Sequence, residues 1–246
     1  MSLRMMRMLL VIVAGVSLIV GSATKQEAPL LPPTFDFTPP SQAGPNSAKV
    51  TFALVDANYA QDEPWTAVAP FNTFSESLSS DFQEILAARG FTVRGPFQRY
   101  DEMTFPDKKG SDLVLQPDLD VSVTSTAKVV PTLFGKQLEA TMVVRGKVKL
   151  EVRESLTGER MWFKDIKLTP ATVECEGKRY ADSTQVPASE GQPAALLQDP
   201  KCANLFGPVL EKFYTDVMDA AWRYLEPEEM AMVKKQSQEI KTRKVY

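Results

Sequence analysis

The most informative stretch of the chain reads Met142-Val-Val-Arg-Gly-Lys-Val-Lys-Leu-Glu-Val-Arg-Glu-Ser-Leu-Thr-Gly-Glu159. Apolar and polar residues alternate along it, and this period of two is typical of a β-strand with one buried and one solvated face. Its last four residues, Leu156-Thr-Gly-Glu159, predict a hairpin turn, so that residues 160–168 pair back. The stretch therefore predicts an antiparallel meander.

A second alternating segment precedes this stretch. A short apolar strand at residues 113–115 leads into it through Pro117, and a loop around residues 131–135 separates the two segments. The segment extends the meander by one more strand. The side chains expected on its buried face are Leu119, Val121, Val123, Ser125 and Ala127.

A strand, a helix and another strand are predicted before this β-rich half. Residues 49–55 and 91–94 are short apolar runs suited to buried strands. Between them, Thr73 and Glu76 have the spacing of a capping box at a helix start, and Gly90 suits the C-terminal cap. The helix has one apolar face, expected in the core, formed by Phe74, Leu78, Phe82, Ile85 and Leu86.

Two helices are predicted after the β-rich half. Residues 205–225 have the periodicity of a long amphipathic helix. Pro227 suits the first turn of another helix, whose apolar face is thin, so residues 226–246 are expected to form a helical tail that projects or frays. The predicted fold class is α/β (α+β): a β-α-β unit followed by an antiparallel meander, with the long C-terminal helix packed on the sheet, over residues 48–225.

The N-terminus has the composition of a secretory signal. Arg4 and Arg7 precede an apolar run at residues 8–20, which is about five residues too short for a comfortable membrane span. Small residues follow, and cleavage after Ala23 is predicted to remove residues 1–23. The chain is therefore expected to be exported, to the periplasm, the outer membrane or the cell surface.

The end of this signal also has a lipoprotein-like form. Leu18-Ile-Val-Gly21 resembles the approach to a bacterial lipoprotein cleavage site, where the next residue is the lipid-bearing cysteine. The next residue here is Ser22, whose hydroxyl cannot form the thioether to lipid. Two alternatives stay open, an engineered replacement of cysteine and a genuine soluble relative. Membrane association is expected only if position 22 is natively cysteine.

Residues 24–47 are predicted to be a proline-rich linker. They contain six of the eighteen prolines, which favour extended polyproline conformation and do not build a core. Phe35 and Phe37 are the exceptions, and either dock on the domain or a partner or are simply exposed.

The two cysteines, Cys175 and Cys202, are expected to form a disulfide, because export places them in an oxidising compartment. They stand 27 positions apart and enclose a stretch rich in Gly, Pro, Ser and charge. Closing that loop contributes about 3 kcal/mol in the chain-entropy model. The alternative, a redox or metal pair, lacks the close spacing of such sites.

Composition lowers the expectation of catalysis. The chain has no histidine, the commonest general base and metal ligand, and no glycine-rich phosphate loop. Removal of Arg4 and Arg7 with the signal takes the formal net charge from −3 to −5, which argues against a nucleic-acid binder. No cofactor or metal is expected. The carboxylates that remain as candidates for a hydrolase or a calcium site are Asp56, Asp62, Glu63, Asp118 and Asp120.

The polar face of the opening stretch is largely basic. Arg145, Lys147, Lys149 and Arg153 alternate with its apolar residues. These four residues, called the basic row below, form a candidate face for an anionic ligand such as a glycan, lipid headgroups or an acidic protein. The alternative is an ordinary solvated face whose charge opposes aggregation.

Three segments resemble the neuraminyllactose-binding hemagglutinin family of bacterial surface lipoproteins. They are Leu86-Ala-Ala-Arg-Gly-Phe-Thr-Val93, Leu113-Val-Leu-Gln-Pro-Asp118 and the hairpin from Gly146 to Glu159, and the likeness covers roughly residues 49–170. The resemblance implies an exported α/β domain, usually lipid-anchored, with an adhesin role. The chain departs from the family pattern in two ways. Ser22 stands where the family has the lipid-bearing cysteine. In the region nearest to the family's basic glycan-binding stretch, residues 124–130, Lys128 is the only basic residue. Sialic-acid binding is therefore carried over to no residue.

Together these features predict an exported, non-catalytic envelope or surface protein of lipoprotein type, with a binding or adhesin-like role. The expected partners are envelope proteins or an anionic glycan or lipid, and not nucleic acid. Two alternatives stay open. One is a structural subunit of an outer-membrane secretion or flagellar assembly, which would use the linker and the terminal helix to reach its neighbours. The other is a carboxylate-dependent hydrolase.

Overall fold

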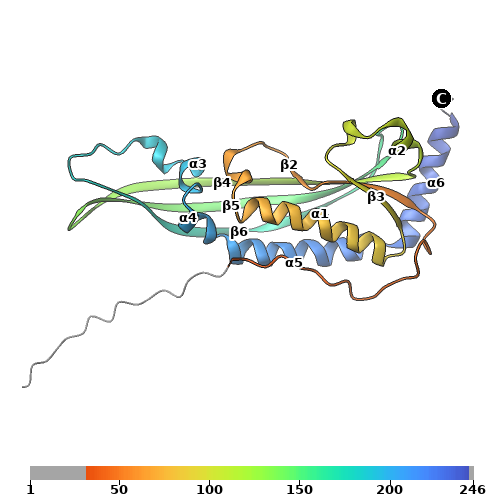
Figure 1. Cartoon of the computed structure of the whole chain (residues 1–246), viewed down its shortest axis with the longest axis horizontal. Helices are drawn as coiled ribbons and strands as arrows, with labels where there is room; N and C mark the ends of the chain where they lie inside the picture. Colours follow the sequence, from red (N-terminus) through yellow and green to blue (C-terminus); the bar gives the residue numbers. More distant parts are fainter. Residues whose placement is uncertain (1–31, 244–246) are drawn as a thin grey trace, which may run out of the picture.

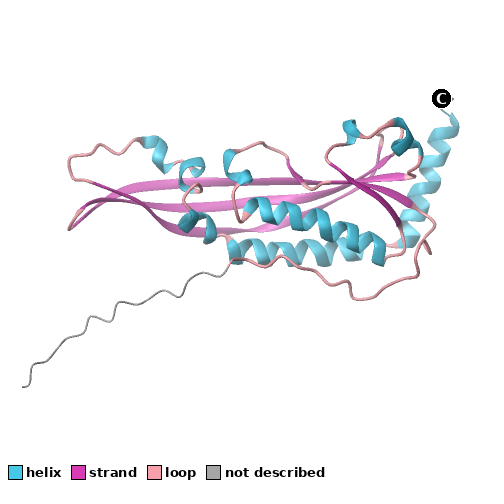
Figure 2. Cartoon of the chain, in the orientation of Figure 1, coloured by secondary structure: helices cyan, strands magenta, loops and turns pink. Residues whose placement is uncertain are grey.

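The computed structural model describes residues 32–243 as an elongated molecule (Figure 1). Helices α1 (Phe71–Ala88) and α5 (Gly207–Tyr224) lie side by side along one face of a long sheet (Figure 2). The predicted signal and Ser22 lie outside the described residues. Among the helices within this range, none combines the length and the apolar character needed to cross a membrane.

All six strands in the described part of the chain form one mixed sheet, in the order β3-β1-β4-β5-β6, with β2 paired to β4 beside this path. β1 is parallel to β3, to which the crossover through α1 leads, and it is also parallel to β4, whereas β4, β5 and β6 are antiparallel. This arrangement confirms the predicted fold class. The strands are β1 (Thr51–Val55), β2 (Asn58–Tyr59), β3 (Thr92–Phe97), β4 (Leu113–Thr132), β5 (Gly135–Glu154) and β6 (Arg160–Tyr180).

The remaining elements are short, apart from the last helix. They are the 3-10 turns η1 (Pro64–Ala67), η2 (Tyr100–Glu102) and η3 (Ala188–Gly191), and the helices α2 (Phe105–Lys109), α3 (Pro193–Leu196), α4 (Pro200–Asn204) and α6 (Pro227–Arg243).

The main core lies between the sheet and the helix pair α1 and α5. The predicted apolar face of α1 is fully buried there, together with the alternating residues of β4 and β5. Aromatic pairs along the two helices show that they run in the same direction. These pairs are Phe71 with Phe206 at 5.5 Å between ring centroids and Phe74 with Phe213 at 5.7 Å, and farther along Arg89 lies 3.7 Å over the ring of Trp222.

A smaller core covers the opposite face of the sheet at the end that contains the parallel strands. Ala53, Val55 and Val114 point to this side and are buried by Met103, with Phe97 and Tyr100 packed around them. The segment through η2 and α2 therefore closes the second face of the β-α-β unit. We call this end of the molecule, where both faces are covered, the proximal end.

The ends of α1 show one prediction that holds and one that is wrong. Gly90 has a φ of +82° and follows the C-cap, and the Phe91 amide donates to the Leu86 carbonyl at 3.0 Å, as in a glycine-terminated helix. The predicted capping box at Thr73 and Glu76 does not form. The helix begins earlier, after Pro70, whose carbonyl accepts from the Phe74 amide at 2.9 Å, so both polar residues already lie inside the first turns.

The described part of the proline-rich linker is partly docked. Phe35 packs against Phe74 and Tyr214 with ring centroids 5.5 and 5.4 Å apart, and the Thr34 amide donates to Glu211 at 2.8 Å. Burial raises the pKa of Asp81, opposed by hydrogen bonds from the Tyr214 hydroxyl and from the backbone of Phe37. Figure 1 shows the linker following α5 before it enters β1. The linker thus behaves as part of the domain around Phe35.

Helix α6 is anchored to the proximal end, so the prediction of a projecting or frayed tail is wrong for most of its length. Met230 and Val233 are buried, and Lys241 pairs with the fully buried carboxylate of Glu154 at 3.1 Å. Lys234 pairs with Asp112 at 2.9 Å. A thin apolar face is sufficient here because ion pairs to the sheet supplement it.

Candidate functional site

The basic row lies on β5, on the sheet face opposite α1 and α5, as its alternation predicted. Three of its four residues form ion pairs with carboxylates. Lys147 pairs with Asp165 at 2.8 Å, and Lys149 and Arg153 both approach Glu151, at 3.2 and 2.7 Å. The hydrogen bond and the charge of Asp165 raise the pKa of Lys147.

The neighbouring strand β4 adds further negative charge beside the basic row. Asp118 stands in register with Lys149, and Asp120 with Lys147, whereas Arg145 is exposed and stands opposite Ser122. The face is therefore of mixed charge along most of β5. Its role as a face for an anionic ligand stays a prediction, with Arg145 as its most accessible member.

The candidate carboxylates are dispersed in the structure. Asp118 and Asp120 belong to the open sheet face just described, and Asp118 accepts a hydrogen bond from Gln116 at 2.8 Å. Asp56 lines a shallow hollow of 510 Å³ with Glu76 and several hydroxyl and amide side chains, but Asp62 and Glu63 are not in its lining. Burial raises the pKa of Asp56, and a hydrogen bond from Ser79 opposes this. Within residues 32–243, no three His, Cys, Asp or Glu side chains are grouped so as to hold a metal ion.

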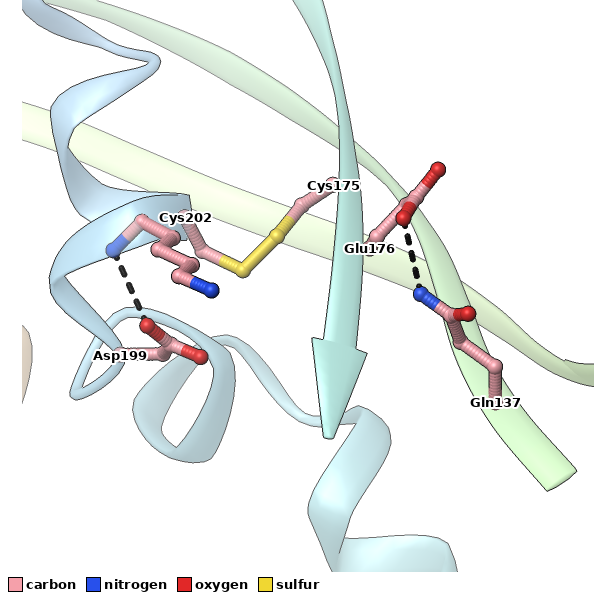
Figure 3. The surroundings of a disulfide bond; sticks show 6 residues. Gln137, Cys175, Glu176, Asp199 and Cys202 are labelled. Carbon is pink, nitrogen blue, oxygen red and sulfur yellow. Dashed lines mark hydrogen bonds between the residues drawn. A yellow bond between two sulfur atoms is a disulfide. The ribbon is translucent and has the colours of Figure 1, made fainter. Parts of the chain in front are cut away.

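Cys175 on β6 and Cys202 on α4 form a disulfide, with Cα atoms 5.4 Å apart (Figure 3). Both cysteines are buried. Asp199 caps α4 by accepting from the Lys201 amide at 3.0 Å, and Glu176 points to the other side of β6, where it accepts from Gln137 at 2.9 Å. The bridge therefore holds α4 on the helix-covered side of the strands, beyond the start of α1.

The end of the molecule opposite α6 exposes two large apolar side chains. Leu133 and Phe134 form the turn between β4 and β5, and they are 96% and 91% exposed. Lys136 donates to the carbonyl of Asp182 at 2.6 Å, which places the loop that follows β6 beside this turn. We call residues 129–136 and 181–187 together the distal end; it lies at the far left of Figure 1.

This apolar turn was not predicted as a site from the sequence. Residues 131–135 were predicted only as a loop, and no role was expected for their side chains. One signal was available. Leu133 and Phe134 are adjacent between two strongly alternating strands, so they belong to neither buried face. Leu133 and Phe134 are the two most exposed large apolar side chains within residues 32–243, and they are adjacent, so the distal end is our candidate functional site.

Comparison with solved structures shows the same fold in a protein described as a neuraminyllactose-binding hemagglutinin homolog from Helicobacter pylori. The match has a TM-score of 0.55 at 15% sequence identity, and covers 85% of this chain and 100% of that chain. At the level of the fold, this confirms the resemblance expected from the sequence.

Two further structures match with lower scores. A Xanthomonas campestris protein from a family of unknown function matches with a TM-score of 0.33 at 13% identity, over 85% of this chain and 97% of its own. A Neisseria meningitidis lipoprotein matches with a TM-score of 0.25 at 13% identity, over 57% of this chain and 88% of its own. No family model matches the sequence, and no curated protein matches it either.

Proposed function

We propose that the chain is an exported, non-catalytic envelope protein of lipoprotein type that works by binding another envelope component through its distal end. The observation that carries the proposal is the exposure of Leu133 and Phe134 at the tip of strands of 20 residues each. Large apolar groups that protrude together from a soluble domain are typical of interaction sites. The fold shared with a protein whose description names a binding role supports the same proposal.

The assembly-subunit alternative has less support. It relied on the linker and the terminal helix to reach neighbouring proteins, and both contact this same chain, through Phe35 and through Met230. The hydrolase alternative relied on paired carboxylates, of which Asp118 and Asp120 face basic partners on an open sheet surface.

Binding is tested by retention of solubilised bacterial envelope components on the immobilised chain. We expect the double variant Leu133→Ser/Phe134→Ser to lose retained material that the wild type holds. Phe105→Ser is the matched control, because Phe105 is 64% exposed on α2 at the proximal end. Equal retention by all three proteins would contradict the proposal.

Export and anchoring are tested by intact mass and cell fractionation of the full chain produced in bacteria. We expect the mass of a chain that begins after Ala23 in the periplasmic fraction. Ser22→Cys should add the mass of a lipid and move the protein to the membrane fraction, whereas Ser22→Ala should not. A full-length product in the cytoplasm would contradict export.

A further inference from the structure

We propose that the distal end inserts into the surface of a lipid bilayer, with Leu133 and Phe134 entering the acyl-chain boundary. This inference rests on the proposed function, and it names the partner of the same site. Three properties of the distal end support it: its shape, its charge and its place relative to the start of the described chain.

The shape of the tip suits a fluid surface. Leu133 and Phe134 are adjacent in a two-residue turn that protrudes from two paired strands, and each is more than nine-tenths exposed. A convex tip of this kind needs a partner that can close around it, and lipid acyl chains do so without a preformed pocket. Phenylalanine and leucine have no polar group, so both can be buried completely in hydrocarbon.

The paired strands hold the tip firmly. The ladder between β4 and β5 is continuous from Leu113 opposite Glu154 to Thr132 opposite Gly135. Gly135 has a φ of +126°, which allows the sharp return after Phe134. The apolar pair is therefore presented by a formed turn.

Cations lie a short distance behind the tip, where lipid headgroups would be if Leu133 and Phe134 were inserted. Lys128 and Glu139 pair at 3.0 Å across β4 and β5, beside Glu176 on β6. Four charged residues of the described chain lie nearer the tip than Lys128, Glu139 and Glu176. They are the cations Lys136, Lys178 and Arg179 and the carboxylate Asp182.

The charges of Lys178 and Arg179, on β6 next to the distal end, make this region locally basic on an acidic chain, whose formal net charge is −3. Lys178 also pairs with Glu190 at 3.1 Å, so part of its charge is balanced within the protein. Lysine and arginine stems can lie along a membrane surface while their charged groups contact anionic headgroups. We therefore expect binding to favour anionic lipid.

The described chain also begins toward the distal half of the molecule. Pro33 lies beside Gly207 at the start of α5, next to α4 and its disulfide to β6. Cys175 is in register with Ala140, and Ala140 is in register with Ala127. Along β4, Ala127 lies about 20 Å before the tip, at about 3.3 Å per residue. Ser22 and Pro32 stand ten positions apart in the sequence, and ten residues of any chain span at most about 36 Å. A lipid attached at position 22, as expected in the Ser22→Cys variant, can therefore reach the same surface as the tip.

The test is co-sedimentation of the purified full chain with sucrose-loaded vesicles of phosphatidylcholine containing about one quarter phosphatidylglycerol. We expect wild type to sediment with these vesicles, and Leu133→Ser/Phe134→Ser to partition about tenfold more weakly or worse. Phe105→Ser should bind as wild type does. Thermal unfolding of each variant checks folding, which these exposed positions should not affect.

A charge-matched pair of variants tests the proposed orientation. Lys136→Gln/Arg179→Gln should weaken binding to the anionic vesicles, whereas Lys147→Gln/Lys149→Gln removes the same charge from the basic row and should not. In a third measurement, the tryptophan introduced by Phe134→Trp should add fluorescence to that of wild type. On vesicles this added emission should shift to the blue, and brominated acyl chains should quench it. Phe105→Trp should show neither effect.

The outcomes separate this inference from the proposed function. No wild-type binding to vesicles, or equal binding by the tip double variant, would overturn lipid insertion. If vesicles are not bound while tip-dependent retention of envelope proteins persists, the lipid inference fails and the proposed function stands. If the tip variant changes neither measurement, both fail.

Discussion

The proximal and distal ends of the molecule share strands β4, β5 and β6 but are stabilised differently. At the proximal end, long helices or α2 cover the sheet, and aromatic rings such as Phe52 and Phe91 fill the space between the layers. Toward the distal end, short helices and one disulfide replace them. Stability therefore comes mainly from apolar burial at one end, whereas the other end presents apolar groups outward and depends on a covalent crosslink.

The largest effect is expected from the main core between the sheet and the helix pair α1 and α5. Phe74→Ala removes a fully buried ring that contacts Phe35, Phe213 and Tyr214, and should lower the free energy of unfolding by about 3–5 kcal/mol. Chemical denaturation measures this. Phe105→Ala, at an exposed position of the same residue type, should change it by less than about 0.5 kcal/mol. Similar costs for both variants would contradict the assignment of Phe74 to the main core.

Loss of the disulfide should have the next largest effect. The double variant Cys175→Ala/Cys202→Ala opens a loop of 27 positions and should cost about 3 kcal/mol. We expect the damage to begin distally, so limited proteolysis should cleave residues 181–192 faster than in wild type. Cleavage appearing first in α1 or α6 would show that the crosslink supports the whole molecule.

A smaller, pH-dependent effect is expected where α6 meets the sheet. Burial of Glu154 would raise its pKa, but hydrogen bonds from the Leu156 and Thr157 amides and from Lys241 outweigh this, and the pKa is lowered. Because the folded pKa lies below the unfolded value of about 4.5, this stabilisation is present above that pH and is lost as the pH falls through the folded pKa.

Unfolding free energies measured between pH 7 and pH 3 test this assignment. Glu154→Gln should flatten the dependence below about pH 4.5, and Lys241→Ala should cost about 2 kcal/mol at pH 7. Lys212→Ala is the control, because Lys212 forms an exposed ion pair with Asp216 at 2.6 Å and should cost less than about 1 kcal/mol. If Glu154→Gln shows the same pH dependence of unfolding as wild type, Glu154 is not the source of that dependence.

The smallest effect is expected on the open sheet face between the two ends. Lys147→Gln/Lys149→Gln should change the free energy of unfolding by about 1 kcal/mol or less, because the Lys147–Asp165 pair is about one-third exposed and the buried carboxylate of Glu151 keeps Arg153 as its partner. Binding of sialylated or other anionic glycans, measured by calorimetry, should not depend on these two lysines. Loss of glycan binding in this variant, with folding intact, would instead establish the basic row as a ligand face.

The elements of this fold that follow from local pattern were predictable from the sequence. The alternation through Val121 and Val148 identified the strands and their buried faces, and the spacing of Phe74, Leu78 and Phe82 identified the helix that covers them. These signals are local, because a strand or helix face repeats within a few residues.

Features that depend on distant partners were not predictable in the same way. The anchoring of α6 requires Glu154 and Asp112, which lie far away in sequence and come next to the helix through the sheet topology. The docking of Phe35 requires the groove between α1 and α5. The exposure of Leu133 and Phe134 depends on where both strands end, which an alternating pattern does not define.

The order of the elements along the chain has a consequence for biosynthesis. Helices α5 and α6 follow all six strands, so the ribosome makes them after the whole sheet. Because the main core closes only when α5 is present, most of the sheet lacks its cover while the chain is being synthesised. A chain ending at residue 206 should therefore bind a hydrophobic dye and lack a cooperative unfolding transition. Late closure of this kind would keep the chain loosely structured for longer, which fits the export proposed above.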